Sequence, residues 1–261
     1  MSLKRFFKRN KIIRYFYFNF LFLVRYVSYL RDYIAFNRLL KSKNKNLKWS
    51  NRYVCLNDKT SNTSFDTHYV YHTAWAARKL KTITPSKHID ISSSIYFNAI
   101  VSAFIPIEFY DYRPAKVNLS GLTPCEGDLF KLPFKNSSVE SLSCMHVIEH
   151  IGLGRYGDPL DVLGDVKAAK EIQRVLKMRG NLLIVVPVGK PNINFNAHRV
   201  YSYEDVIAMF DKLELKEFSL LMDDSKGAEF IIDAPAESVQ SQNYSCGCFW
   251  FRKVDNIHDN Y

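Results

Sequence analysis

Apolar and polar positions recur at several different spacings along the chain, and each spacing predicts a kind of element. From about residue 65, segments with apolar residues at helical intervals alternate with short, almost wholly apolar segments that are typical of buried strands. The expected helices are 69–81, 96–104, 165–176 and 203–213. The expected strands are 88–91, 107–112, one that ends at 126–128, 139–145, 181–188, 216–222 and 246–253.

This alternation predicts an α/β fold with a Rossmann-like, doubly wound and mostly parallel sheet. No helix separates the expected strands 216–222 and 246–253, so we expect an antiparallel hairpin at one edge of the sheet. Lys177, Arg179 and Gly180 follow the helix 165–176, and we expect them to cap it, with Gly180 at the C′ position.

Polar side chains stand at the ends of successive expected strands. In an open α/β sheet the ligand lies beyond the carboxyl ends of the strands, at the point where the strand order reverses. The polar residues at these ends are Asp90, Asp111, Asp128 and His146. We therefore expect these side chains to line a single crevice.

The first 45 residues have another pattern, that of a basic and aromatic arm. Only ten residues separate Arg14 from Arg25, whereas a membrane-spanning helix needs about 20 apolar residues. On a helix, one face carries Phe16, Phe20, Leu23, Val27, Leu30 and Ile34, and roughly the opposite face carries Lys4, Lys8, Lys11, Arg14 and Arg25. The pattern predicts an amphipathic arm over 1–45, a polar linker over 46–64 and a folded domain over 65–261.

Two partners for this arm remain open. Basic residues with many aromatic side chains are typical of a helix that lies in an anionic membrane interface. The same helix could instead pack on the core of its own chain or on a second subunit. We therefore expect a cytoplasmic protein, peripheral on the inner face of the membrane if the first alternative holds.

The positive charge is concentrated in this arm. Residues 1–50 hold 13 of the 36 Lys and Arg and a single acid, Asp32, which gives a net charge of +12. The remaining residues hold 23 basic and 25 acidic side chains, a net charge of −2 out of the total of +10. This distribution argues against nucleic acid as a partner of the domain. The five cysteines are odd in number and irregularly spaced, so we expect reduced thiols.

Several short motifs resemble those of class I S-adenosylmethionine-dependent methyltransferases. These are IDISS (89–93), YD (110–111), GDL (127–129) with LPF (132–134), VIEH (147–150) and RVLK (174–177) with Gly180. More narrowly, DTHYVYHTAWAARKL, SLSCMHVIEHIGLGRYGDPLD and PVGKPNINFNAHRVYS resemble the DUF268 family, a methyltransferase-like group associated with bacterial surface-polysaccharide gene clusters. The resemblance covers about residues 65–253.

The resemblance implies a cofactor site for S-adenosylmethionine. Asp111 would accept the ribose hydroxyls, and Asp128 would bind the adenine amino group with Leu129 against the ring. The first loop, formed by Asp90, Ser92 and Ser93, would lie near the methionine part. The acceptor implied by the family association is a glycan or a lipid-linked saccharide of surface-polysaccharide synthesis.

The resemblance also implies where the acceptor would lie. His146 and Glu149 would stand where the methyl group and the acceptor meet. Together with His198, they are the catalytic candidates, since neutral imidazole titrates near the working pH. The expected acceptor-binding residues are Arg155, Tyr156, Asp158 and Arg199. Arg155 and Asp158 have a second interpretation, that they pair with each other and make the loop rigid.

The first loop departs from the family pattern, because residues 92–94 are all serine where the family has glycine. Serine with a positive φ is strained, so cofactor affinity could be reduced. The rival hypothesis is a non-catalytic, methyltransferase-like module that binds a partner or the membrane in the same pathway.

A zinc site is the other hypothesis for the sequence HVIEH, residues 146–150, which has the H-x-x-E-H form of inverted zinc proteases. That chemistry needs both histidines on one face of a long helix, with a third ligand downstream. The segment instead follows an expected strand, and Gly152 and Gly154 come soon after it. We therefore expect no metal, and a structural role for His150.

Overall fold

The computed structural model describes residues 11–223 and 229–254. The chain divides into two compact units, 1–64 and 65–261. None of the helices in the described part of the chain is long and apolar enough to cross a membrane.

The first unit is built on one long helix, α2 (Lys11–Lys41). Part of the expected linker packs back on this helix: Nη1 of Arg25 lies 2.5 Å from Oδ1 of Asn57, and the rings of Tyr33 and Trp49 meet edge to face at 5.0 Å. A short 3-10 helix, η1 (Trp49–Asn51), lies in this returning segment. Lys4 and Lys8, expected on the basic face, lie outside the described residues.

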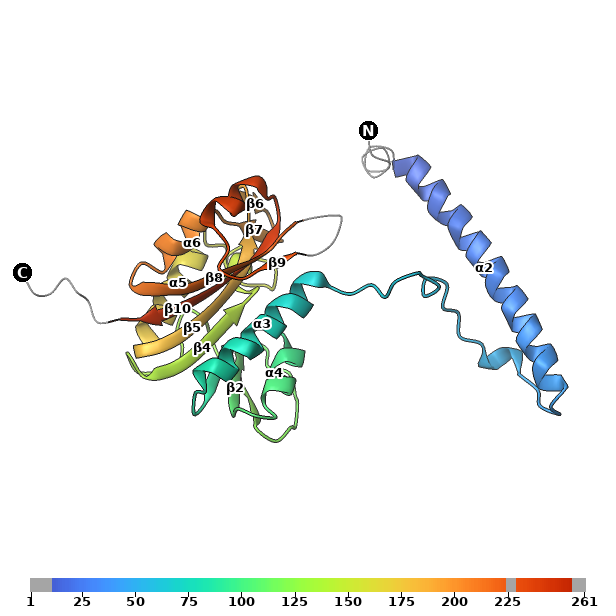
Figure 1. The fold of residues 1–261 in the computed structure, drawn as a ribbon, viewed down its shortest axis with the longest axis horizontal. Coiled ribbons are helices and arrows are strands. Elements are labelled where there is room, and N and C mark those ends of the chain that lie inside the picture. Colours follow the sequence, from blue (N-terminus) through green and yellow to red (C-terminus); the bar gives the residue numbers. More distant parts are fainter. Residues whose placement is uncertain (1–10, 224–228, 255–261) are drawn as a thin grey trace, which may run out of the picture. The chain divides into compact units, whose positions relative to one another are not determined.

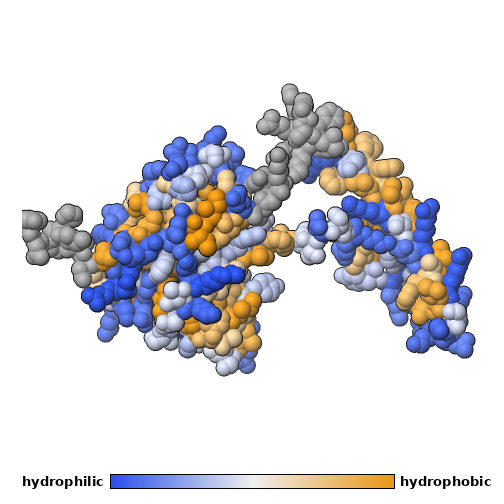
Figure 2. Space-filling view, in the orientation of Figure 1, coloured by the Kyte–Doolittle hydropathy of each residue, from blue (hydrophilic) through white to orange (hydrophobic). Residues whose placement is uncertain are grey.

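Much of the expected apolar face of α2 is open in this unit. Phe16, Phe20 and Leu23 are 67%, 62% and 59% exposed, and Figure 2 shows hydrophobic residues over much of the helix. Leu30 is partly covered. The helix is therefore stabilised by the returning segment on one side and keeps aromatic side chains in contact with solvent on another.

The second unit is an eight-stranded mixed sheet with the order β3-β2-β1-β4-β5-β10-β8-β9 (Figure 1). The strands are β1 (His88–Ile91), β2 (Ile107–Asp111), β3 (Leu122–Glu126), β4 (Val139–Met145), β5 (Leu176–Val188), β8 (Leu213–Leu221), β9 (Phe230–Ile231) and β10 (Ser245–Lys253). The first five strands in this order, from β3 through β2, β1 and β4 to β5, are parallel to one another. The expected Rossmann-like α/β fold is confirmed.

The expected antiparallel hairpin is present. β10 is antiparallel to both β8 and β5, so it lies between them. β9 adds two residues beyond β8 at the edge. A separate small hairpin, β6 (Asn192–Asn194) with β7 (His198–Val200), lies inside the segment that leads from β5 to the next helix.

Helices cover both faces of the sheet. α3 (Thr67–Ile83) and α4 (Ile95–Val101) pack on one face, and α5 (Gly164–Val175) and α6 (Tyr203–Met209) pack on the other (Figure 1). Successive β4 residues serve the two cores in turn, since Cys144 lies in the α5–α6 core and Met145 in the α3–α4 core. Each face therefore has a continuous hydrophobic core.

Local sequence explains where several elements begin. Asp66 caps α3, because its carboxylate accepts a hydrogen bond from the Tyr69 backbone N–H at 3.1 Å. Ser202 and Asp205 form a reciprocal capping box at the start of α6. Two 3-10 helices, η2 (Ile148–His150) and η3 (Ala236–Ser241), complete the unit.

The expected cap over 177–180 is wrong. α5 ends at Val175, and β5 begins at once with Leu176, whose φ of −66° and ψ of 125° are extended. Arg179, not Gly180, takes the left-handed conformation, with a φ of 62°. A Cβ on Gly180 would lie 3.0 Å from the Val139 carbonyl oxygen, so this glycine allows β5 to approach β4 closely.

Candidate functional site

The loop after β1 keeps a glycine-like backbone although it has no glycine. Ser92 has a φ of 51°, in the left-handed region. Its N–H and hydroxyl donate to the Tyr110 carbonyl oxygen at 2.8 Å and 3.2 Å. These bonds hold the loop against the end of β2. The strain that the sequence suggested is therefore real, and the neighbouring strand compensates for it.

Asp90 does not lie at the open edge of the sheet. The structure thus corrects the expectation that its side chain contacts the cofactor. The residue is fully buried within β1. Its carboxylate accepts hydrogen bonds from the Ser93 N–H at 3.1 Å, from Asn98 Nδ2 at 2.8 Å and from the Ser143 hydroxyl. Asp90 thus anchors the first loop from beneath. The Ser93 hydroxyl in turn accepts from the Met145 N–H at 3.0 Å, which ties this loop to the end of β4.

A buried histidine extends this network. His88 Nδ1 lies 2.8 Å from the Ser141 hydroxyl, and its Nε2 lies 2.9 Å from the Ser143 hydroxyl. Burial lowers the pKa of His88 to about 3, so the ring is neutral. Burial also raises the pKa of Asp90, although the hydrogen bonds from Ser143, Asn98 and Ser93 act to lower it. The network supports the first loop without reaching solvent.

Asp111 lies at the end of β2 and Asp128 just beyond the end of β3, as expected. Asp111 is the last residue of β2, and its Oδ1 accepts from the Arg113 N–H at 2.7 Å. Asp128 is exposed, and its Oδ1 accepts from the Phe130 N–H at 2.8 Å. In each carboxylate one oxygen shapes a turn, and within the described part of the chain the other makes no hydrogen bond and is available to a ligand. Leu129, expected against the adenine ring, is instead 8% exposed and packs in the α5–α6 core.

His146 directly follows β4 and is held at both ring nitrogens. It has a φ of 55°, a strained conformation for a residue other than glycine. Its Nδ1 lies 3.0 Å from Oε1 of Glu149, and its Nε2 lies 3.5 Å from Sγ of Cys246. Burial alone would lower the pKa of His146, but the Cys246 thiol and the Glu149 carboxylate raise it to about 10. Without an ion, these two groups therefore favour the protonated ring, which is poorly suited to accept a proton.

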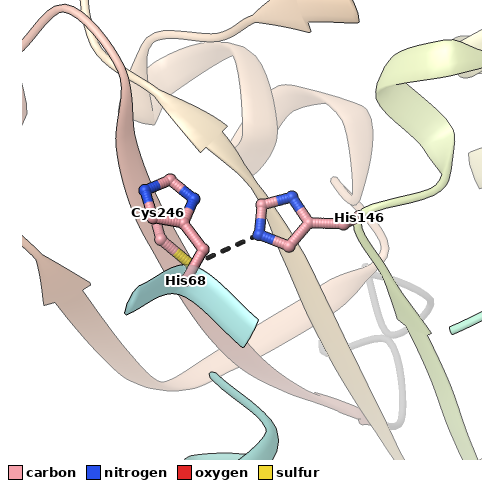
Figure 3. Close-up of side chains that lie close together, drawn as sticks. All are labelled: His68, His146 and Cys246. Carbon is pink, nitrogen blue, oxygen red and sulfur yellow. Dashed lines mark hydrogen bonds between the residues drawn. The ribbon is translucent and has the colours of Figure 1, made fainter. Parts of the chain in front are cut away.

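The residues around His146 were not expected from the sequence. His68 of α3, His146 and Cys246 of β10 bring their donor atoms within 4.8 Å of one another (Figure 3). His72, one turn after His68, is fully buried, with its ring centroid 5.0 Å from that of His146. The sequence feature that could have indicated this cluster is the spacing H-x-x-x-H of His68 and His72, because it places both histidines on one face of α3.

The Cys246 thiol differs from an ordinary buried cysteine. Burial raises its pKa, but contacts with Cys248, His146 and His72 lower it well below its usual value. The neighbouring Cys248 and the distant Cys144 have pKa values raised by burial. Cys246 therefore has the thiolate character that metal binding or nucleophilic chemistry needs.

His198 lies close to this cluster, with Tyr244 between. The Tyr244 ring is 5.3 Å from that of His68 and 4.8 Å from that of His198. Burial is the main cause that lowers the pKa of His198, and Asn194 Nδ2 lies 3.1 Å from its Nε2. Of the expected catalytic histidines, His198 is thus the one that is neutral at physiological pH.

The loop after η2 is held together by its own polar residues. The Asp158 carboxylate accepts from the N–H groups of Gly152 at 2.7 Å and of Tyr156 at 3.2 Å. Burial raises the pKa of Asp158, but these backbone hydrogen bonds outweigh it and lower the pKa. Asp158 therefore stabilises its own loop, which gives no support to a role in sugar binding or to a pair with Arg155.

Arg155 and Tyr156 remain exposed on this loop. The Arg155 guanidinium lies 5.1 Å from the centre of the Tyr156 ring and donates to the Ala197 carbonyl oxygen at 3.2 Å. His150 Nδ1 contacts the same carbonyl oxygen at 2.5 Å. His150 thus has the structural role that was expected, and it does not join His146 in an inverted zinc motif.

Arg199 was expected to bind the acceptor, and the structure corrects this. The residue is 5% exposed. Its Nη1 donates to the Ile151 carbonyl oxygen at 2.6 Å, and its Nε lies 3.3 Å from Oδ2 of Asp165. These contacts use the guanidinium to join β7 to the loop after η2 and to α5.

An apolar groove of about 690 Å³ runs between α3 and α4. Its lining includes Val70 and Ala77 of α3 and Ile100 of α4. Tyr69 also lines it, and the same ring stacks against that of His146 at 5.8 Å. One end of the groove therefore reaches the histidine cluster.

A family model covers part of this site. Residues 131–243 match DUF268, described as "Caenorhabditis protein of unknown function". The resemblance to DUF268 is confirmed over this segment. The DUF268 segment contains His146, Glu149 and His198, whereas Ser92 and Asp111 precede it. None of the curated proteins matches the sequence.

Solved structures are similar over a larger share of the chain than the family model. N-methyltransferase NodS from Bradyrhizobium japonicum, in complex with S-adenosyl-L-homocysteine, is 13% identical, with a TM-score of 0.51 over 76% of this chain and 94% of that one. The YcgJ protein from Bacillus subtilis is also 13% identical, with a TM-score of 0.50 over 72% of this chain and 100% of that one. The DUF268 segment is therefore part of a unit with the class I methyltransferase fold.

Proposed function

We propose that residues 65–261 bind S-adenosylmethionine and transfer its methyl group to an oxygen or nitrogen acceptor. The observation that carries this proposal is the conformation of Ser92, which keeps the left-handed turn that the family builds with glycine. Strained backbone of this kind clusters at functional sites. The turn is joined through Tyr110 to the strand that ends in Asp111.

The donor set at the strand ends fits the cofactor. The free carboxylate oxygen of Asp111 would accept from the ribose hydroxyls, and that of Asp128 would accept from the adenine amino group. Residues 92–94 would lie against the methionine part. When bound, S-adenosylmethionine supplies an electrophilic methyl group on a sulfonium. Asp90 and Asn98 serve this site indirectly, by fixing the first loop.

His198 is the group that would take a proton from the acceptor. It is partly exposed and its pKa is lowered, chiefly by burial, so a free imidazole is available at neutral pH. His146 would serve differently, since both of its ring nitrogens are engaged. Glu149 is 1% exposed and orients the His146 ring. The remaining contribution to catalysis is the positioning of the two substrates.

The acceptor that we propose is a lipid-linked saccharide of surface-polysaccharide synthesis. The apolar groove between α3 and α4 supports the lipid part, because its open lining would be covered by a hydrocarbon chain. The exposed Arg155 and Tyr156 beside the strand ends support the polar part, since guanidinium binds phosphate and an aromatic ring packs on a sugar. The family association adds the link to polysaccharides.

We also propose that α2 brings the enzyme to an anionic membrane. Its aromatic side chains, among them Phe16 and Phe20, are exposed within the first unit. The basic residues of the arm would be attracted to acidic lipid headgroups. A cytoplasmic protein that is peripheral on the inner face would meet lipid-linked acceptors there.

The test is methyl transfer by the full chain. Methyl-labelled S-adenosylmethionine is incubated with a lipid-linked saccharide, and in parallel with the same saccharide in water-soluble form. We expect label in the lipid-linked product, little in the soluble one, and none with Asp111→Asn. The matched control is Glu126→Gln, on the neighbouring strand end, which should leave transfer unchanged. Transfer to a protein or small metabolite but to no saccharide would remove the acceptor from the proposal.

A further inference from the structure

The cluster of His68, His146 and Cys246 has the geometry of a metal site. Zinc binds thiolate sulfur at about 2.3 Å and imidazole nitrogen at about 2.0 Å, so tetrahedral coordination separates the two donors by roughly 3.5 Å. The separation of the Cys246 Sγ and the His146 Nε2 is 3.5 Å. Every pair of donor atoms in the cluster lies within 4.8 Å.

Outer contacts engage one ring nitrogen in each of two histidines, His146 and His72, and leave the other nitrogen for an ion. His146 places Nδ1 against the Glu149 carboxylate at 3.0 Å, which leaves Nε2 directed at the sulfur. His72 places Nδ1 against the His68 carbonyl oxygen at 2.6 Å, which leaves Nε2 as its free donor. Metal-binding histidines usually show this arrangement, with the far nitrogen held by a carboxylate or a backbone carbonyl.

His72 provides an independent sign that a ligand is missing. The residue is fully buried, and among the described residues its Nε2 makes no hydrogen bond of normal geometry. Buried polar atoms are nearly always satisfied. The ring meets that of His146 in a T-shaped contact, with 5.0 Å between centroids, so His72 borders the cluster of His68, His146 and Cys246. A positive ion there would satisfy it.

We propose that His68, His72, His146 and Cys246 together bind one zinc-type divalent ion. Such ions bind imidazole nitrogen and thiolate sulfur, whereas Mg²⁺ and Ca²⁺ prefer oxygen ligands. His68, His146 and Cys246 supply three donors that already lie close together, and His72, which borders them, would close the site as the fourth. The ion would tie the first turns of α3 to the end of β4 and the start of β10, beside the position proposed for the acceptor.

The proposal is tested on the full chain, purified without chelator, by elemental analysis and by titration of the metal-free protein with Zn²⁺ or Co²⁺. We expect one ion per chain. With Co²⁺ we expect a thiolate-to-metal charge-transfer band that Cys246→Ser abolishes. His68→Gln should weaken binding at least a hundredfold. Glu149→Gln, which removes only an outer contact, should weaken it about 10–100-fold.

Matched controls distinguish this site from binding of the ion at surface histidines or cysteines. His150→Gln changes a histidine that is bound to the Ala197 carbonyl oxygen, and Cys125→Ser changes a cysteine of β3; neither should alter affinity. His68 is partly exposed, so its substitution leaves a folded chain if Cys246→Ser does not. Absence of binding by the wild type, unchanged affinity in His68→Gln, or an equal loss in His150→Gln would overturn the proposal.

Ion binding does not depend on the proposed methyl transfer. A chain that binds Zn²⁺ but no S-adenosylhomocysteine would keep this site and remove the enzymatic function. A chain that binds S-adenosylhomocysteine but no metal would do the reverse. The two results can therefore be told apart on the same protein preparation.

Discussion

Sγ of Cys246 lies 3.5 Å from Nε2 of His146, although the two residues are 100 positions apart in the sequence. The sheet brings them together, because β5 pairs with β4 on one side and with β10 on the other. His146 donates its backbone N–H to the Val185 carbonyl oxygen, and Cys246 is paired with Pro187 in the same strand. The two side chains therefore meet over the end of β5, on the face that α3 covers.

Removal of the proposed ion should destabilise the second unit. An ion present at about 100 times its dissociation constant adds about 2.7 kcal/mol to the free energy of unfolding. That corresponds to roughly 5–10 °C in Tm for a domain of this size. Thermal unfolding with and without chelator measures the difference. We expect the chelator to lower the Tm of the wild type and of His150→Gln, and to leave the Tm of Cys246→Ser unchanged. An equal Tm in the wild type with and without chelator would contradict the closed structural site.

Ser92 should tolerate glycine and reject a β-branched residue. Ser92→Gly relieves the left-handed backbone, so the free energy of unfolding should change by no more than about 1 kcal/mol. Ser92→Val should lower it by about 1–3 kcal/mol and weaken the binding of S-adenosylhomocysteine. Ser94, in the same loop, has an ordinary φ of −65°, so Ser94→Val is the control that should affect both quantities less. Chemical unfolding and calorimetry provide the two measurements. Equal losses in Ser92→Val and Ser94→Val would show that the turn is not the critical feature.

His88 should make the unit less stable in mild acid. Its pKa is about 3 in the folded chain and about 6.5 in the unfolded one. Between pH 7 and pH 5 the unfolded chain binds a proton that the folded chain does not. The free energy of unfolding should therefore fall as the pH falls, by about 2 kcal/mol across this window. His88→Gln lacks this contribution. The difference in free energy of unfolding between wild type and variant should therefore narrow by that amount as the pH falls from 7 to 5. Urea unfolding measures both proteins. If the free energies of unfolding of wild type and His88→Gln fell in parallel with pH, the buried ring would not be the cause of the pH dependence.

The exposed face of α2 should bind anionic vesicles. Each large apolar side chain that enters the membrane contributes about 1.5–3 kcal/mol, so Phe20→Ser and Leu23→Ser should each weaken binding about 10- to 100-fold. Ser28, which is partly covered in this unit, offers Ser28→Ala as a control with no expected change. Co-sedimentation with liposomes measures the effect, and added salt should reduce it. Equal pelleting of the full chain and a chain without residues 1–45 would contradict a membrane role for the arm.

Much of the fold could be predicted because its strands are short, buried and regularly spaced. β1 and β4 have the bounds expected from their apolar runs. The antiparallel pairing of β8 and β10 was expected because the sequence shows no amphipathic α-helix between them; only the short strand β9 and the 3-10 helix η3 lie there. The expected helix cap at Gly180 failed because β5 starts without a loop. A glycine needed for close strand packing and a glycine at a helix end look alike in the sequence.

The site was predicted less completely, for two physical reasons. Polar residues of irregular loops often bind their own backbone, as Asp158 and Arg199 do, and the sequence does not reveal where such side chains turn. Clusters such as His68 with Cys246 join segments far apart in the chain, so their proximity depends on strand order. Asp111 was easier to place, because the last residue of a parallel strand must stand at the open edge.

The most direct test of the central claim is calorimetric titration of the full chain with S-adenosylhomocysteine, beside Asp111→Ala and the control Glu126→Gln. We expect micromolar binding by the wild type and by Glu126→Gln, and none by Asp111→Ala. Absence of binding by a wild-type chain that is shown to be folded would contradict a live cofactor site. The non-catalytic module would then account better for this fold.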